Sequence, residues 1–520
     1  MRKFVLIHFL LFLIIAVFSK HPWPFLMLTV AQIAYVPIAL RFVMRRTDWL
    51  AKYYLYLAIP AYISVASVQL FSPEWAAYPA FIYYAFTVVI ALNGLSRFLQ
   101  RGFTNIEEFS IDLGLMYIAL GGGWYFAYVA DIDTGFTPLL TWLTAIHFHY
   151  SAFLLPVFIG LLGRLNKPRS YSIYSVLLLA APMVVAIGIT FSRWIELFSV
   201  ILYIVGLAGI ISLAWRTRFP NRLQKWLVGI SFSSLGVTIL FSVLYVLGNG
   251  FGLTSVTIDF MLRFHGILNC IVFALIGIVG WSLSIPASVY EEPSFPISRI
   301  KGKQRVDELG ISGRHSGLVD DMKHYGIREV SPRIIDFYEN TIEYRLYATV
   351  RWRKWFMPFA FLYSFISRKT EQINLPIHQR EVEMTGDIIT LDTEVDGRPA
   401  VRAWIRKVEN SYAFIALYSH HRSSTDKEFM NIALPLPFST MTGVLELIEQ
   451  GEDLQLTSKK TDSASDAGIY LSSKLGKYFR LPLEENFVVR EEVDGSLMAK
   501  HEMWIFSIPF LTIDYRIYHS

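Results

Sequence analysis

The sequence has one cysteine, few charged residues and no glycine motif for nucleotides. Cys270 lies in an apolar run, so the chain has neither a disulfide framework nor a thiolate zinc site. The absence of a P-loop and of a dinucleotide fingerprint argues against work driven by a nucleotide. Charged residues make up 17% of the chain and hydrophobic residues 54%, whereas a soluble protein has about 25% charged residues. The composition therefore predicts a membrane protein.

The charged residues are unevenly distributed along the chain. Residues 1–290 contain 18 Lys and Arg and 9 Asp and Glu, whereas residues 291–520 contain 29 and 33. We therefore predict a transmembrane helical bundle over 1–285, a linker with a short helix over 286–330, and a soluble strand-rich domain over 331–520. The basic residues of the last domain are scattered and nearly balanced by acids, so nucleic acid is not expected as a partner.

About ten apolar runs are long enough, or nearly long enough, to cross a bilayer about 30 Å thick. They cover residues 4–19, 23–43, 53–71, 76–96, 109–129, 138–163, 171–191, 195–215, 226–247 and 258–285. No small-x-small cleavage site follows the first run, so we interpret it as a retained helix rather than a signal peptide.

Lys and Arg are concentrated in alternate loops between these runs. With the N-terminus inside, the outer side keeps only Lys20 and Arg193. Loops rich in Lys and Arg lie on the cytoplasmic side of multi-pass proteins. The sequence therefore predicts a cell-membrane protein with both termini in the cytoplasm and with the lipid bilayer as its partner.

Polar residues occur at membrane depth in three of these runs, where they are costly and often functional. The candidates for binding a substrate or protons are His147, His149, Tyr150, Glu196, Asp259, Arg263, His265 and Asn269. All would lie in the outer half of the membrane, so a single outward-facing pocket is a hypothesis. Alternatively, Asp259 with Arg263, and His265 with Asn269, satisfy each other along one helix, because each pair is four residues apart.

The residues His147, His149 and His265 also suggest a transition-metal site, because imidazole binds zinc, copper and iron. Helical geometry argues against it, since His147 and His149 are about 200° apart around a helix. The favoured interpretation is that one histidine makes a hydrogen bond to a neighbouring helix and the other packs in the bundle or meets the membrane interface, and no cofactor is predicted.

Three consecutive glycines, Gly121, Gly122 and Gly123, lie inside the fifth run. Each costs helix propensity of about 1 kcal/mol relative to alanine. They indicate either close helix packing, which we favour, or a helix break of the kind that transporters use to bind substrates.

Alternating apolar and polar residues predict a strand over residues 342–352. Further strands are expected near residues 387–394, 399–407, 411–420, 428–434, 438–448, 480–491, 497–506 and 510–518. Asp396-Gly397 and Asp494-Gly495 predict hairpins, and hence an antiparallel sheet or partial barrel that is able to enclose a ligand. Residues 351–369 combine basic ends with an apolar body too short to span a bilayer. This segment predicts a membrane-interface helix, with Arg351, Trp352, Trp355 and Phe356 as candidate contact residues; a plain core helix is the alternative.

Several motifs together resemble the YndJ-like family of integral membrane proteins of Bacillus and its relatives. They are His147-Phe-His-Tyr150, Arg263-Phe-His-Gly266, Phe429-Met-Asn-Ile-Ala-Leu-Pro-Leu-Pro437, Leu481-Pro-Leu-Glu-Glu-Asn-Phe487 and His501-Glu-Met-Trp504. The resemblance implies a multi-pass membrane protein of a kind classed with transporters, and it assigns no catalytic residue.

Three functions remain open from the sequence. The first and favoured one is a transporter, or a protein that handles lipids or small molecules, with the histidine-containing pocket as its site. The second is a membrane-anchored sensor or assembly partner that acts through a ligand-binding or lipid-binding β domain. The third is a membrane-embedded metalloenzyme, and a non-enzymatic role is favoured over it.

Overall fold

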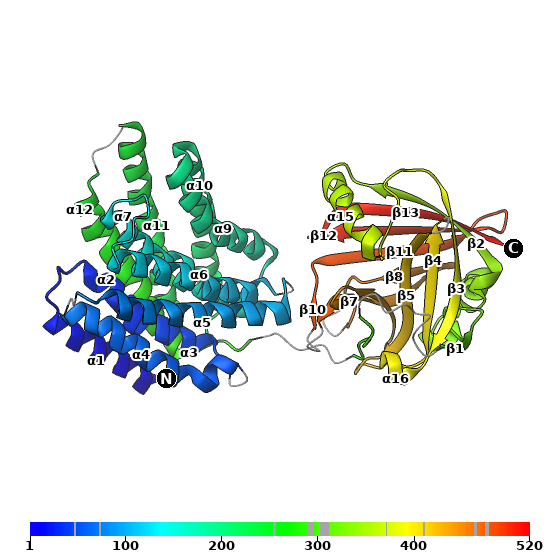
Figure 1. Ribbon diagram of the computed structural model, residues 1–520, viewed down its shortest axis with the longest axis horizontal. Coiled ribbons are helices and arrows are strands. Elements are labelled where there is room, and N and C mark those ends of the chain that lie inside the picture. Colours follow the sequence, from blue (N-terminus) through cyan, green and yellow to red (C-terminus); the bar gives the residue numbers. More distant parts are fainter. Residues whose placement is uncertain are drawn as a thin grey trace. The chain divides into compact units, whose positions relative to one another are not determined.

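The apolar runs of the N-terminal half form helices and the alternating runs of the C-terminal half form strands (Figure 1). The computed structural model describes residues 1–45, 48–71, 74–103, 105–252, 256–288, 295–301, 311–370, 372–408, 411–461, 465–473 and 478–520. The chain divides into two compact units. The first comprises Met1–Arg101 and Asn105–Tyr290, and the second comprises Gly102–Thr104 and Glu291–Ser520. Residues 289–294 and 302–310 of the predicted linker lie outside the described residues.

The first unit is entirely helical in the part that the structure describes. Its elements are α1 (Arg2–Phe18), α2 (Phe25–Val30), η1 (Ala31–Tyr35), α3 (Val36–Val43), α4 (Trp49–Phe71), α5 (Ala77–Arg101), α6 (Ile106–Val129), α7 (Pro138–His149), η2 (Tyr150–Leu154), α8 (Leu155–Leu165), α9 (Arg169–Phe191), α10 (Arg193–Arg216), α11 (Arg222–Phe251), α12 (Ile258–Phe260), η3 (Met261–Gly266), η4 (Leu268–Leu275) and α13 (Ile276–Leu283).

Eight helical stretches in the described ranges are long and apolar enough to cross a membrane. They are Phe25–Val43, Trp49–Phe71, Ala77–Leu99, Pro138–Leu165, Arg169–Phe191, Arg193–Arg216, Arg222–Gly248 and Ile258–Leu283. Two predicted spans are not among them: α1 is shorter, and α6 begins with Glu107 and Glu108 and contains Asp112. The helical membrane region is confirmed, and the count of ten crossings is not.

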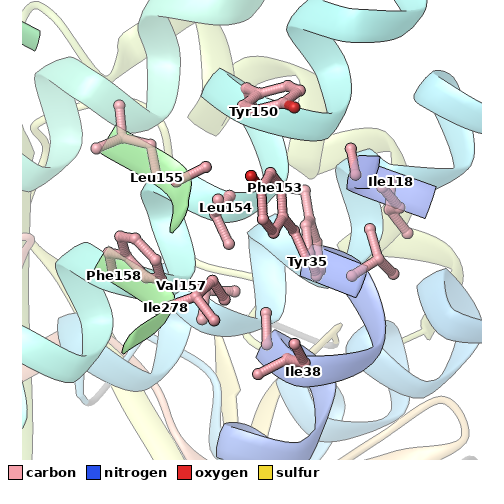
Figure 2. Close-up of a cluster of buried hydrophobic side chains, with 14 of the residues drawn as sticks. Tyr35, Ile38, Ile118, Tyr150, Phe153, Leu154, Leu155, Val157, Phe158 and Ile278 are labelled. Atoms are coloured by element: carbon pink, nitrogen blue, oxygen red, sulfur yellow. The ribbon is translucent and has the colours of Figure 1, made fainter. Parts of the chain in front are cut away.

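Three of these stretches contain π-helical turns, in which the backbone bonds reach one residue further than in an α-helix. The turns are η1, η2, and the pair η3 and η4. Tyr35 of η1 and Tyr150 of η2 lie within the same buried apolar cluster (Figure 2). Wider turns of this kind leave carbonyl groups available for other donors, and they often mark functional positions.

Close packing explains the three glycines of α6, which continues through them without the break considered above. A Cβ at Gly121 would lie 2.8 Å from His149 Nδ1, and one at Gly122 would overlap Thr87 Oγ1. At Gly123 the nearest atom would be 3.4 Å away, on Tyr84. Small residues at the first two positions therefore allow α6 to approach α5 and α7.

The second unit is built on one antiparallel sheet. Its strands are β1 (Ile311–Arg314), β2 (Tyr344–Trp352), β3 (Val382–Leu391), β4 (Val401–Val408), β5 (Ser411–Arg422), β6 (Glu428–Leu436), β7 (Ser439–Gln450), β8 (Asp453–Thr457), β9 (Gly468–Ser473), β10 (Tyr478–Arg480), β11 (Leu483–Glu491), β12 (Leu497–Ile505) and β13 (Ile508–His519). Its helices are η6 (Met322–Tyr325), α14 (Pro332–Glu339), η7 (Thr341–Glu343), α15 (Met357–Thr370) and α16 (Thr393–Asp396).

The strands close into a barrel, because β8 pairs with both β7 and β11. The ring runs β2-β3-β4-β5-β6-β7-β8-β11-β12-β13 and returns to β2. The pairing of β7 divides: Glu446–Gln450 pairs with β8, whereas Ser439–Val444 pairs with β9. The predicted antiparallel β domain is thus confirmed. The connection at Asp396-Gly397 is longer than a tight hairpin, because α16 occupies it.

Alternate residues of each strand point into the barrel and form one apolar core. At one end the core is filled by Ala348, Val489 and Ala499, and it is covered by Phe337 and Tyr338 of α14. At the opposite end, where β12 meets β13 at Ile505 and Ile508, inward-facing side chains are only partly buried. The barrel therefore has one closed end and one more accessible end.

Candidate functional site

Two of the predicted histidines lie together. The ring centroids of His147 and His265 are 6.4 Å apart. His147 Nδ1 donates to Leu143 O at 2.7 Å, and His265 Nδ1 donates to Thr238 O at 3.1 Å. Asn269 joins the same neighbourhood, because its Oδ1 accepts from Thr238 Oγ1 at 3.2 Å. The expected hydrogen bond between His265 and Asn269 is thus replaced by two hydrogen bonds with Thr238 on α11, one that His265 donates and one that Asn269 accepts.

His149 faces a different part of the bundle. It is buried, its Nδ1 donates to Ala145 O at 2.8 Å, and its Nε2 accepts from the Tyr83 hydroxyl at 2.8 Å. The Tyr83 and His149 rings are stacked. This is the hydrogen bond between helices that the favoured sequence interpretation expects for one histidine.

Tyr150 turns toward the π-helical turns. Its hydroxyl donates to Met27 O at 2.7 Å and lies 3.3 Å from Cys270 Sγ. Tyr35 donates to Cys270 O at 2.8 Å. The two tyrosines therefore link three separate helices through carbonyl groups, which is a structural arrangement rather than a binding pocket.

The charged candidates form local pairs. Arg263 Nε lies 2.9 Å from Asp259 Oδ2, and both side chains are exposed. Arg193 Nη1 lies 3.4 Å from Glu196 Oε2. The eight predicted residues thus lie in separate groups instead of one pocket. Within the described residues, no group of three or more His, Cys, Asp or Glu side chains is placed to hold a metal ion.

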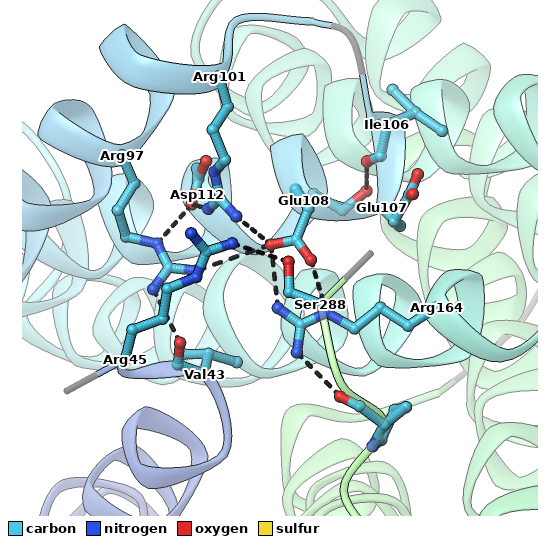
Figure 3. A network of polar contacts seen from close by, with 12 residues as sticks. Val43, Arg45, Arg97, Arg101, Ile106, Glu107, Glu108, Asp112, Arg164 and Ser288 are labelled. Carbon is cyan, nitrogen blue, oxygen red and sulfur yellow. Dashed lines mark hydrogen bonds and ion pairs between the residues drawn. The ribbon is translucent and has the colours of Figure 1, made fainter. Parts of the chain in front are cut away.

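Sequence reasoning missed a buried ionic network at the beginning of α6 (Figure 3). Asp112 Oδ1 accepts from Arg97 Nε at 2.9 Å and from Arg101 Nη2 at 2.5 Å. Glu108 accepts from Arg164 at 2.7 and 2.9 Å and also pairs with Arg101. These five side chains are at most 5% exposed.

The network ties α5, α6 and α8 together, and it also holds the chain that follows α13. Arg164 Nη1 donates to Pro286 O at 3.1 Å, and Arg45 donates to Ser288 at 2.8 Å. The sequence signal for this network was the presence of three acidic residues, Glu107, Glu108 and Asp112, near the start of an apolar helix. The predicted span began at residue 109 and left Glu107 and Glu108 out.

The barrel interior holds a second feature that the sequence did not indicate, a buried cation. Arg406 of β4 is 8% exposed, and its guanidinium lies 3.4 Å from the centroid of the Trp404 ring and 4.6 Å from that of Phe414. Its Nη2 donates to the Tyr418 hydroxyl at 3.3 Å, and its Nε has no hydrogen-bond partner. In the described part of the chain, Arg406 makes no ion pair.

The groups around Arg406 are polar but mostly neutral. Burial raises the pKa of Tyr418 and of Tyr515, and the nearby Arg406 opposes this shift. Both hydroxyls therefore stay protonated at neutral pH. Glu485 also lies inside the barrel, where its Oε2 is 3.0 Å from Nε2 of His501. Glu485 is thus engaged with a histidine, and no carboxylate of the described residues lies within ion-pair distance of Arg406.

The candidate interface residues lie where β2 leads into α15. Trp352 stacks on Phe356, and Phe356 packs on Phe510, so these two side chains belong partly to the barrel core. Trp355 is exposed and its Nε1 donates to Pro509 O at 2.9 Å. Arg351 is exposed and pairs with Asp514 at 3.2 Å.

Comparisons with known proteins agree with the membrane assignment. The family model described as YndJ-like protein matches residues 26–273. The chain is 39% identical over 457 residues to the protein named "Uncharacterized membrane protein YndJ" of Bacillus subtilis (strain 168), covering 85% of this chain and 83% of that protein. No solved structure matches the chain.

Proposed function

Because the chain belongs to the YndJ-like family of membrane proteins, we propose that its helices anchor a β barrel at the membrane and that the barrel binds an amphiphile with an anionic head. The observation that carries this proposal is Arg406, a buried cation that makes no ion pair with any residue the structure describes. An isolated charge in a protein interior is costly unless it is paired. A ligand carboxylate or phosphate would supply the missing charge and accept from Nε.

The accessible end of the barrel suits the apolar part of such a ligand. Phe414, Leu434, Phe487 and Met503 project into the barrel and are only partly buried. They lie toward the end that α14 does not cover. An alkyl chain that occupied this end would remove their remaining apolar surface from water, at about 25 cal/mol per Å².

The transporter hypothesis built on one histidine pocket has less support. His147 and His265 are neighbours, but His149, Glu196 and the Asp259–Arg263 pair lie elsewhere. The sensor or lipid-handling role of the β domain is therefore preferred. The barrel would report on, or hold, an anionic lipid at the membrane.

The proposal includes the orientation of the chain in the membrane. The excess of Lys and Arg in alternate loops supports ten crossings, including α1 and α6, with both termini in the cytoplasm. A C-terminal fusion to green fluorescent protein should fluoresce, and a fusion to alkaline phosphatase should be inactive. The opposite pair of results would place the barrel outside.

Native mass spectrometry of the full-length detergent-solubilised protein tests the binding proposal. Oleate should bind with one molecule per chain, and its neutral analogue oleyl alcohol should bind more weakly. Arg406→Met should weaken oleate binding by about tenfold or more, because a charge-assisted hydrogen bond contributes about 1.5–3 kcal/mol. Arg490→Met, at an exposed position on β11, is the matched control and should bind as the wild type does. Equal affinity for oleate and its alcohol, or an unaltered Arg406→Met variant, would refute the proposal.

A further inference from the structure

Helix α15 presents its apolar face away from its own domain. The residues that face the barrel are small: Ala360, Ser364 and Ser367 are buried. The large side chains lie outside, and each is more than half exposed: Phe359, Phe361, Leu362, Phe365 and Ile366. A surface helix of a soluble protein has the reverse arrangement.

Hydrogen bonds fix α15 in this orientation. Ser367 Oγ donates to Asn374 Oδ1 at 3.2 Å on the buried side. At the start of the helix, Trp355 Nε1 donates to Pro509 O at 2.9 Å, which attaches this end to β13. The exposed apolar face is therefore a built feature of the fold, and not the result of a loosely attached helix.

The charged residues of this segment all have one sign, and one of them, Arg351, is paired with Asp514 of β13. Between Arg351 and Thr370 the sequence contains no Asp or Glu. Its five cations are all exposed and flank the apolar residues on both sides: Arg351, Arg353, Lys354, Arg368 and Lys369. A row of large apolar residues between basic ends is typical of a helix that lies in the interface of a bilayer with anionic head groups.

We infer that α15 lies in the surface of the bilayer that the chain's own helices span, with Phe359, Phe361, Leu362, Phe365 and Ile366 in the acyl region and the five cations at the head groups. The occupant follows from composition, because the same chain carries eight stretches able to cross a membrane. This inference does not depend on the ligand proposed for the barrel. It moves the candidate contact surface from Trp352 and Phe356, which pack on the core, to the outer face of α15.

Depth-dependent quenching on the full-length chain tests this inference. The protein carries Cys270→Ala, which removes its one cysteine, and a nitrobenzoxadiazole label at Leu362→Cys. It is reconstituted into nanodiscs of phosphatidylcholine and phosphatidylglycerol that contain doxyl lipids. The control label is at Val493→Cys, in the β11–β12 turn at the α14-covered end of the barrel, where the side chain is fully exposed.

The label at 362 should be quenched by doxyl lipids about fivefold more strongly than the label at 493, as expected for a side chain below the head groups. A second label at Phe365→Cys should repeat the result, which guards against a local effect of one substitution. Quenching of 362 by aqueous iodide as strong as at 493 would show that the face is in water. A blue-shifted label without lipid quenching would show that protein covers it, either the helical unit or a second copy. Either result would overturn the inference.

Discussion

Two buried arginines of the barrel domain should respond in opposite directions to the same substitution. Arg398 is fully buried, and its guanidinium pairs with Asp396 at 2.6 and 3.2 Å. Arg406 is also buried but forms no ion pair within the described ranges of the chain. If Arg406 is kept for a ligand rather than for the fold, its replacement by methionine should not destabilise the ligand-free domain.

The expected magnitudes follow from the partners of each group. Burial of a cation costs several kcal/mol. At Arg406 this cost is opposed by a hydrogen bond to Tyr418, worth about 1.5–3 kcal/mol, by the interaction with the Tyr515 hydroxyl, and by contacts with two aromatic rings, worth about 0.5–2 kcal/mol each. Because these terms nearly cancel and methionine adds apolar burial, Arg406→Met should change the unfolding free energy by about 0–3 kcal/mol in the stabilising direction. Arg398→Met leaves the buried Asp396 carboxylate without its cation, with Ser298 Oγ still donating to it, so it should cost about 3–5 kcal/mol.

Hydrogen exchange on the delipidated full-length protein measures the change in local stability that Arg406→Met and Arg398→Met each cause in the barrel. Peptides from β4 and β5 report the local opening free energy of the barrel. Arg490→Met is again the surface control and should match the wild type. If Arg406→Met destabilises β4 and β5 as much as Arg398→Met does, Arg406 is a structural residue and the argument for a missing anion fails.

Three further predictions concern other parts of the chain. Gly122→Ala should lower the melting temperature of the detergent-solubilised protein, with a cost of about 1–3 kcal/mol, because the added methyl group overlaps Thr87. The neighbouring Gly123→Ala should be neutral or stabilising. Equal effects of the two substitutions would contradict the packing described for α6. Glu108→Gln should destabilise the helical unit by about 3–5 kcal/mol, because it removes the carboxylate that pairs with Arg164 and one of the two carboxylates that pair with Arg101. Exposed Glu74→Gln is the control, and equal thermal stability of the two variants would argue against the network. The hydroxyl of Tyr344 and the amide of Asn340 donate hydrogen bonds to Asp336 and lower the pKa of its carboxyl group. The ionised carboxylate therefore stabilises the fold at pH values above its unfolded pKa of about 3.9. This stabilisation is lost as the pH falls through the lower pKa of the folded state. Urea unfolding of wild type between pH 5 and pH 2 should therefore lose stability that Asp336→Asn does not lose, and parallel pH profiles would contradict this assignment.

The sequence predicted those features that repeat along the chain. Apolar runs gave the helical region, and alternation gave β2 and most of the barrel strands, because both patterns follow directly from burial on one side. The short strands β1, β8, β9 and β10 were missed, since three to six residues carry little periodicity. The closure of the barrel through β8 was therefore also beyond the sequence.

The side-chain partners were harder to predict than the elements. Helical spacing correctly separated His147 from His149, but it assigned Asn269 to His265 when both residues bond Thr238. The sequence of β4 mixes apolar and basic residues without regular alternation, and only the barrel shows that Arg406 points inward. Contacts between residues far apart in the sequence decide such cases.

Photolabelling with a diazirine-bearing fatty acid tests the central claim most directly, because it reports where an anionic amphiphile lies on the full-length protein. The account predicts cross-links to inward-facing residues of the barrel near Phe414, Leu434, Phe487 and Met503, and it predicts that Arg406→Met removes them while Arg490→Met does not. Cross-links confined to the helical unit, or barrel cross-links that persist in Arg406→Met, would contradict it.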